Sequence, residues 1–183
     1  MKFFLFHCWG GDGRSCWSGW LQDELRVLGY EVLSPDFPET QNPKLEAWLA
    51  TARSIVPEFR PEDGWVLISH SLGGPAILRL LESFGPGEKA KAVIMVAGFA
   101  KDLGIREIRN FVDRDFDWKR IREKADKFIV ISSDNDPYIE LSEGQRMAKL
   151  LNAKLITEPG AGHINEGAGF TKYERLMEII RSL

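Results

Sequence analysis

The chain has 183 residues, enough for a single domain over residues 1–183 that buries roughly 70% of its unfolded surface without disulfide or metal staples. Its formal net charge is −3 and charges of both signs are spread along the sequence, so we expect no nucleic-acid partner and no membrane anchor. The apolar start is interrupted by His7 and then by glycines, which leaves it too short for a signal-peptide core or a membrane span.

The two cysteines, Cys8 and Cys16, have neither metal-ligand spacing nor a third partner in the sequence. They predict free thiols in a reducing compartment rather than a disulfide framework. We therefore expect a cytoplasmic protein that acts on a small molecule, while a protein partner is neither predicted nor excluded.

The first third of the chain predicts strands and helices in alternation. Residues 3–7 are an apolar run without alternation, as in a strand buried on both faces of a parallel sheet. Apolar residues recur at helical spacing over 17–28 and end at a glycine, and residues 30–33 predict a second strand. An asparagine cap and a first-turn proline open a predicted helix over 42–56.

The middle of the chain contains an abrupt change of pattern. The predicted strand over 64–69 stops at Ser-His-Ser, and a helical pattern over 71–84 starts directly after it. A fourth strand follows at 92–97. Residues 98–117 form one long connection with scattered charges and no clean period, which predicts a small cap or a mobile flap.

The last third continues the alternation. A short helix over 118–125 precedes a strand over 128–131, and a capping box opens a helix over 142–151. A short strand over 154–157 and a final helix over 171–183, also opened by a capping box, complete the pattern.

Six strands joined by helices predict an α/β fold. We expect a three-layer sandwich whose six-stranded, mainly parallel sheet carries helices on both faces, because each right-handed crossover covers one face. Ligands in such sheets bind beyond the carboxyl ends of the strands, where the strand order reverses. We therefore expect the functional residues to lie in the loops that follow strands.

Ser71 occupies the corner between the third predicted strand and its helix. A nucleophile elbow holds a serine there in a strained conformation with its oxygen exposed, and it requires small residues two before and two after. Ser69 and Gly73 meet this requirement, so the usual G-x-S-x-G has become S-x-S-x-G. A serine at a helix start is usually only a cap, so the motif alone does not identify Ser71 as a nucleophile. Other residues of the chain must support that role.

A serine nucleophile needs a base, and the chain has three histidines. His163, in a glycine-rich loop after the last predicted strand, is the natural candidate. His70 adjoins Ser71 and is expected to point away from it, as one of the residues of the substrate pocket. His7 ends a strand, where a structural hydrogen bond is the ordinary role.

The acid that orients the histidine has two candidates after the fifth predicted strand, Asp134 and Asp136. We favour Asp136, because it lies further beyond the strand and precedes Pro137, whose ring rigidifies the turn. Asp36, after the second strand, is an outside candidate that we expect to be a loop or capping acceptor instead.

An oxyanion hole requires two preorganised donors, and losing one typically costs about a hundred- to a thousandfold in rate. The amide of Leu72, directly after Ser71, is the first expected donor. The amide of Trp9, in the loop after the first strand, is the second.

These motifs together resemble a known family. The order Ser71, Asp136, His163 is that of the α/β-hydrolases, and the chain is similar over nearly its whole length to the small serine hydrolases typified by retinoblastoma-binding protein 9 and the YdeN-like proteins. The segments that carry the resemblance are Trp17-Ser18-Gly19-Trp20-Leu21, Ser34-Pro35-Asp36-Phe37-Pro38, Ser69-His70-Ser71-Leu72-Gly73-Gly74, Phe116-Asp117-Trp118, Ser132-Ser133-Asp134-Asn135-Asp136-Pro137-Tyr138 and Gly160-Ala161-Gly162-His163-Ile164-Asn165.

The resemblance implies a minimal α/β-hydrolase fold without a large lid, in which Ser71, Asp136 and His163 form the catalytic triad. The chain departs from the family at Cys8, which stands where the oxyanion loop commonly has glycine after histidine. Ser69 replaces the first elbow glycine, as is common in this family.

The function predicted from these residues is carboxylesterase-like hydrolysis of a small ester, thioester or amide through an acyl-enzyme, with no metal and no organic cofactor. We expect a shallow pocket bounded by Trp9, the residues around Phe37, His70, the 98–117 segment and Ile164. The alternative is a protein-interaction module that keeps the hydrolase fold without catalysis.

Overall fold

The computed structural model describes residues 1–183 and contains one sheet of six parallel strands, so the predicted α/β architecture is confirmed. The strand order is β2-β1-β3-β4-β5-β6, and it reverses direction between β1 and β3. The bounds are β1 (Lys2–Phe6), β2 (Glu31–Leu33), β3 (Trp65–His70), β4 (Ala92–Val96), β5 (Phe128–Ser133) and β6 (Lys154–Glu158).

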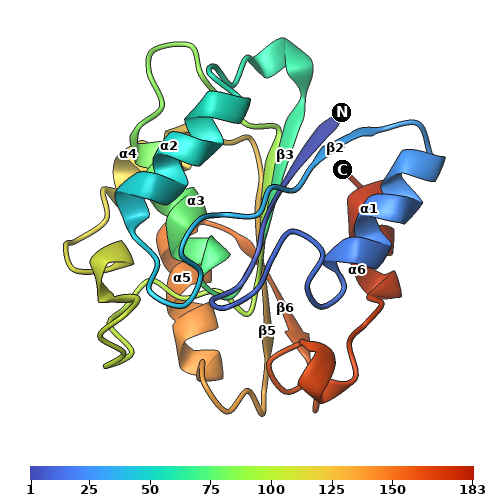
Figure 1. The fold of residues 1–183 in the computed structure, drawn as a ribbon, viewed down its shortest axis with the longest axis vertical. Helices are drawn as coiled ribbons and strands as arrows, with labels where there is room; N and C mark the ends of the chain where they lie inside the picture. Colours follow the sequence, from blue (N-terminus) through green and yellow to red (C-terminus); the bar gives the residue numbers. More distant parts are fainter.

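Helices cover both faces of the sheet (Figure 1). One face carries α2 (Leu45–Ile55), α3 (Gly73–Glu82), α4 (Trp118–Glu123) and α5 (Leu141–Leu151), and the other carries α1 (Ser18–Val27) and α6 (Glu174–Arg181). Three short 3-10 helices were not predicted: η1 (Pro61–Asp63), η2 (Arg109–Phe111) and η3 (Glu166–Ala168). No helix has both the length and the apolar character that a membrane crossing needs.

Each face of the sheet has its own apolar core, and β1 contributes to both. Phe4 and Phe6 belong to the core under α2 and α3, whereas Phe3 and Leu5 belong to the core under α1 and α6. This alternation follows from the two-residue period of a strand. Because both faces are covered, the strand is apolar at every one of these positions, as the sequence predicted.

The caps predicted for the amino ends of α2, α5 and α6 are wrong. Helix α2 begins at Leu45 rather than at 42–43, and the N–H of Leu45 donates to Asn110 Oδ1 at 2.7 Å. Helices α5 and α6 begin at Leu141 and Glu174, and neither has a side-chain cap. A long-range contact therefore takes the place of the predicted local cap at α2, while α5 and α6 begin without a side-chain cap.

The 98–117 segment packs against the helices rather than lying loose above them. Phe99 and Phe111 are buried in the core. Its residue Asn110 caps α2, and Ala100 bonds to Glu143 of α5. The segment is therefore anchored to both of these helices and forms a wall beside the carboxyl ends of the strands.

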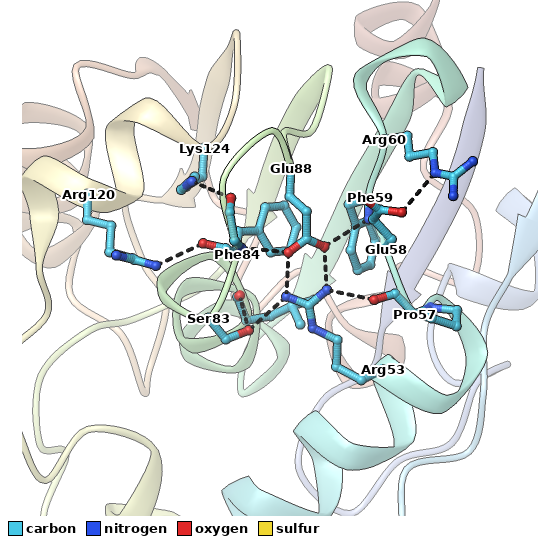
Figure 2. Close-up of polar contacts among 12 residues, drawn as sticks. Arg53, Pro57, Glu58, Phe59, Arg60, Ser83, Phe84, Glu88, Arg120 and Lys124 are labelled. Carbon is cyan, nitrogen blue, oxygen red and sulfur yellow. Dashed lines mark hydrogen bonds and ion pairs between the residues drawn. The ribbon is translucent and has the colours of Figure 1, made fainter.

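At the amino ends of β3 and β4, a polar network joins α2 to the end of α3 (Figure 2). Glu88 binds both terminal nitrogens of Arg53 and accepts the backbone N–H groups of Phe59 and Gly85. Burial raises the pKa of the Glu88 carboxyl, but these hydrogen bonds outweigh it and hold that pKa below its usual value.

Candidate active site

Ser71 follows β3 directly and has a left-handed backbone, with a φ of 52°. This conformation is unfavourable for a residue with a side chain, so the surrounding structure must impose it. The N–H of Ser71 donates to Val96 O at 3.0 Å, and its carbonyl accepts from Gly74 N–H at 2.8 Å. The turn places Ser71 on the wall of a cavity, as an elbow requires.

Two glycines allow α3 to approach the sheet so closely. A Cβ added at Gly73 would lie 2.4 Å from Phe6 O, and one at Gly74 would lie 3.1 Å from Gly98 Cα. The first distance is far below van der Waals contact. Gly73 is therefore required by the close contact of the elbow with β1.

His163 and Asp136 are paired beside the elbow. Asp136 Oδ2 lies 2.7 Å from His163 Nδ1, and the Asp136 side chain is only 1% exposed. The other carboxylate oxygen, Oδ1, accepts hydrogen bonds from the backbone N–H groups of Tyr138 and Ile139. The carboxylate thus holds the proton on Nδ1 and leaves the Nε2 lone pair of His163 available as a base.

The other two acids considered from the sequence hold loops in place. Asp134 Oδ1 accepts Gly160 N–H at 2.7 Å, at the start of the loop that carries His163. Asp36 Oδ1 accepts Gly13 N–H at 2.8 Å. Of the three candidates, only Asp136 contacts a histidine.

His7 and His70 have backbone partners. His7 Nε2 accepts from Phe37 N–H at 2.9 Å, and burial lowers the pKa of His7, which keeps the ring neutral. His70 is 2% exposed, and its Nε2 lies 2.9 Å from His163 O. Its ring also contributes to the wall of the cavity.

Ser71 and His163 line one cavity of about 310 Å³. Most of its lining is apolar, and the 98–117 segment supplies one wall through Phe99, Leu103, Ile105 and Ile108. Trp9 and Tyr138 complete the rim, and both are exposed. The ring of Tyr138 meets that of His163 edge-on, with centroids 5.0 Å apart.

Two residues predicted for the pocket are not part of it. Phe37 is 2% exposed and stacks on Phe6 and Trp48 inside the core. Ile164 is fully buried in the opposite core, and its carbonyl accepts from Trp17 Nε1. Both follow strands at the correct edge of the sheet, but their apolar side chains turn inward, where burial is most favourable.

The amides of Trp9 and Leu72 are free to act as oxyanion donors. Neither N–H donates to another backbone or side-chain acceptor of the chain, although Leu72 itself is fully buried. Both residues line the cavity that contains Ser71. Unpaired amides in residues that line the cavity are compatible with the predicted oxyanion hole.

The same cavity contains both cysteines, which are unpaired. The Sγ atoms of Cys8 and Cys16 and one ring nitrogen of His70 all lie within 4.8 Å of one another. The proximity of the Cys8 thiol and of His70 lowers the pKa of Cys16, while the neighbouring Cys16 and burial raise the pKa of Cys8. No sequence spacing indicated this cluster, because its third member comes from β3.

The chain is similar to known proteins over nearly its whole length. A family model described as serine hydrolase matches residues 3–182. The putative hydrolase YdeN of Bacillus subtilis is 31% identical over 182 residues, covering 99% of this chain and 95% of YdeN. The serine hydrolase RBBP9 of Rattus norvegicus is 26% identical over 178 residues, covering 95% of this chain and 90% of RBBP9.

The crystal structure of the B. subtilis ydeN gene product has a TM-score of 0.93 to this structure, with 29% identity, and the match covers 99% of this chain and 97% of that one. The predicted α/β-hydrolase fold is therefore confirmed. By sequence and by structure, the chain belongs to the serine hydrolase family.

Proposed function

We propose that the protein cleaves a small ester, thioester or amide through an acyl-enzyme formed on Ser71, in the manner of a carboxylesterase. The observation that carries the proposal is the 2.7 Å contact between Asp136 and His163, on the cavity that also exposes the strained Ser71. No other acid and histidine pair lies beside a serine at the end of a strand. We infer that these three residues are the catalytic triad.

In the first half of the reaction, Ser71 Oγ attacks the carbonyl carbon while His163 Nε2 takes the hydroxyl proton. Asp136 stabilises the resulting imidazolium through Nδ1–H and keeps the ring oriented. The charge that develops on the carbonyl oxygen is held by the amides of Leu72 and Trp9. His163 then gives its proton to the leaving group.

In the second half, a water molecule attacks the acyl-enzyme as His163 takes the water's proton. The tetrahedral intermediate uses the same two amides and collapses to the free acid, and the proton returns to Ser71 Oγ. Every step uses side chains and amides of the chain itself.

The shape of the cavity supports a small substrate. Its volume of about 310 Å³ is at the lower end of the range of roughly 300–1,000 Å³ for ligand pockets. The apolar side chains of Leu103, Ile105 and Ile108 favour a short hydrocarbon acyl group over a charged one. We therefore expect activity to fall as the acyl chain exceeds the length of this wall.

The test is a hydrolysis panel of nitrophenyl esters with acyl groups from acetyl to decanoyl. Wild-type protein should turn over the short esters, and His163→Ala should lose nearly all of that activity. If His163→Ala keeps activity within about tenfold of wild type, the assignment of the base is wrong. If well-folded wild-type protein turns over none of the esters, the interaction-module hypothesis becomes the better account.

A further inference from the structure

The cluster of Cys8, Cys16 and His70 brings three metal-ligand side chains together from three elements of the fold. Cys8 follows β1, Cys16 precedes α1 and His70 ends β3. Their ligand atoms lie within 4.8 Å of one another, on the wall of the cavity. Tetrahedral coordination with Zn–S bonds of about 2.3 Å separates two sulfurs by about 3.8 Å. The two sulfur atoms and the imidazole nitrogen therefore need to approach one another by only about 1 Å to bind one ion.

The hydrogen bonding of His70 leaves one ring nitrogen free to bind a metal ion. Its Nε2 lies 2.9 Å from His163 O, and since a carbonyl only accepts, Nε2 carries the proton. Nδ1 then presents a lone pair, and it is buried without a hydrogen-bond partner although the residue is only 2% exposed. Metal-binding histidines usually donate the other ring N–H to a carbonyl or carboxylate in this way.

The two cysteines are held at the backbone and remain accessible. The carbonyl of Cys8 lies 2.8 Å from His7 Nδ1, and the N–H of Cys16 donates to Glu166 Oε1 at 3.0 Å. Cys16 also has a left-handed backbone, with a φ of 57°. Both side chains are half-buried and line the cavity, which gives an ion a path from solvent.

Two thiolates and one imidazole are soft donors that suit zinc, and they neutralise the charge of Zn²⁺. We propose that Cys8, Cys16 and His70 form a Zn²⁺ site whose fourth coordination position faces the cavity. Binding releases the thiol protons and needs no oxidant or reductant. Nothing in the proposed hydrolysis requires this ion.

Binding of Zn²⁺ at this site should also affect hydrolysis, an inference that rests on the proposed function. Cys8 precedes Trp9, whose amide is the proposed oxyanion donor, and His70 precedes Ser71. An ion bound here occupies the same cavity as the substrate and fixes the loop that carries Trp9. Zn²⁺ should therefore inhibit reaction at Ser71.

The binding test uses the full chain, stripped of metal with a chelator and kept reduced, with thiol titration to verify two free thiols. Co²⁺ serves as a spectroscopic probe because it occupies tetrahedral thiolate sites. Wild-type protein should bind one Co²⁺ with thiolate-to-cobalt charge-transfer absorption, and one equivalent of Zn²⁺ should displace it. Cys8→Ser and Cys16→Ser should each weaken binding by at least about tenfold, because even outer-shell changes at metal sites cost that much.

Two controls separate this site from the catalytic residues. His163→Ala, whose Nδ1 is occupied by Asp136, should keep the cobalt spectrum although hydrolysis is lost. Circular dichroism verifies that each variant is folded. Absence of charge-transfer absorption in reduced wild-type protein, or unchanged affinity in Cys16→Ser, would overturn the site.

The effect on hydrolysis is measured separately, as fluorophosphonate labelling of Ser71 with and without Zn²⁺. Zn²⁺ should slow labelling of wild-type protein and have a much weaker effect on Cys16→Ser. If cobalt binds but Zn²⁺ leaves labelling unchanged, the inhibitory role is wrong. If labelling fails without any metal, the proposed function is wrong and the cobalt result still decides the site.

Discussion

The two edges of the sheet differ in the polar groups they hold, although each has a buried group without a partner, Trp65 Nε1 at the amino edge and His70 Nδ1 at the carboxyl edge. At the amino ends of the strands, Glu88 receives donors from Arg53, Phe59 and Gly85 (Figure 2). At the carboxyl ends, the amides of Trp9 and Leu72 have no partner. His70 Nδ1 at the same edge is also buried without one.

An unpaired buried polar group costs roughly 1–3 kcal/mol, so its retention needs a reason. At the carboxyl edge two buried groups without a partner, the amide of Leu72 and His70 Nδ1, belong to residues that line a cavity, where a ligand can satisfy them. At the amino edge the paired groups join helices that are distant in sequence. We therefore expect substitutions at the carboxyl edge to change activity and those at the amino edge to change stability.

Ser71→Ala should have the largest effect on activity. Loss of the nucleophile removes the covalent pathway, and in a serine protease such a change lowers kcat by about 10⁶-fold. Alanine keeps the left-handed backbone and loses only the hydroxyl, so the midpoint of thermal unfolding should stay close to that of wild type. Steady-state hydrolysis and thermal unfolding measure the two quantities, and activity within tenfold of wild type would refute the nucleophile.

Asp136→Asn should have the second-largest effect on activity, a decrease in kcat of about 10⁴-fold. An amide no longer fixes the required tautomer of His163. Asp134→Asn is the matched control, two residues away, where an amide oxygen can still accept from Gly160. It should keep nearly full activity. Equal losses in the two variants would show that the loop, rather than the contact with His163, decides the rate.

Gly73→Ala should lower both the rate of hydrolysis and the stability of the fold, because the elbow itself is packed against β1. The new methyl would clash with Phe6 O, and overpacking of this kind costs about 1–3 kcal/mol. Gly74→Ala faces a looser contact at Gly98 and should cost less. Urea unfolding of both variants measures the difference, and the reverse order would contradict the packing account.

Glu88→Gln should lower the free energy of unfolding by about 2 kcal/mol at neutral pH while leaving hydrolysis unchanged, since it weakens the charge-assisted hydrogen bonds between Glu88 and Arg53. Because the folded-state pKa of Glu88 lies below the usual 4.5, the native state binds fewer protons, so this stability is complete above about pH 4.5 and is lost as the pH falls. Glu58→Gln, in the exposed pair with Arg60, is the control and should change nothing measurable. A difference between wild type and Glu88→Gln that persists at low pH would contradict this assignment.

The sequence was sufficient where a pattern depends on periodicity or on chain order. The apolar runs predicted the parallel sheet, and the rigid turn at Pro137 favoured Asp136, which is the acid that contacts His163. It was insufficient where two distant segments meet through residues that no motif marks. Asn110 caps α2 from more than sixty residues away, a pairing that no local motif encodes.

The same limit explains the errors around the cavity. Phe37 and Ile164 follow strands, but the choice between cavity and core depends on packing partners such as Trp48 and Trp17. The cluster of Cys8, Cys16 and His70 is also assembled only by the fold. Residue type and loop position predicted which edge carries the chemistry, while three-dimensional packing determines which side chains face it.

The most direct test of the proposed triad is the intact mass of the protein after treatment with a fluorophosphonate. We expect one adduct on wild-type protein, located at Ser71 by peptide mapping, and one on Glu88→Gln. Ser71→Ala and His163→Ala should remain unlabelled under the same conditions. An adduct at another residue, or no adduct on folded wild-type protein, would contradict the claim that the carboxyl edge of the sheet is a working active site.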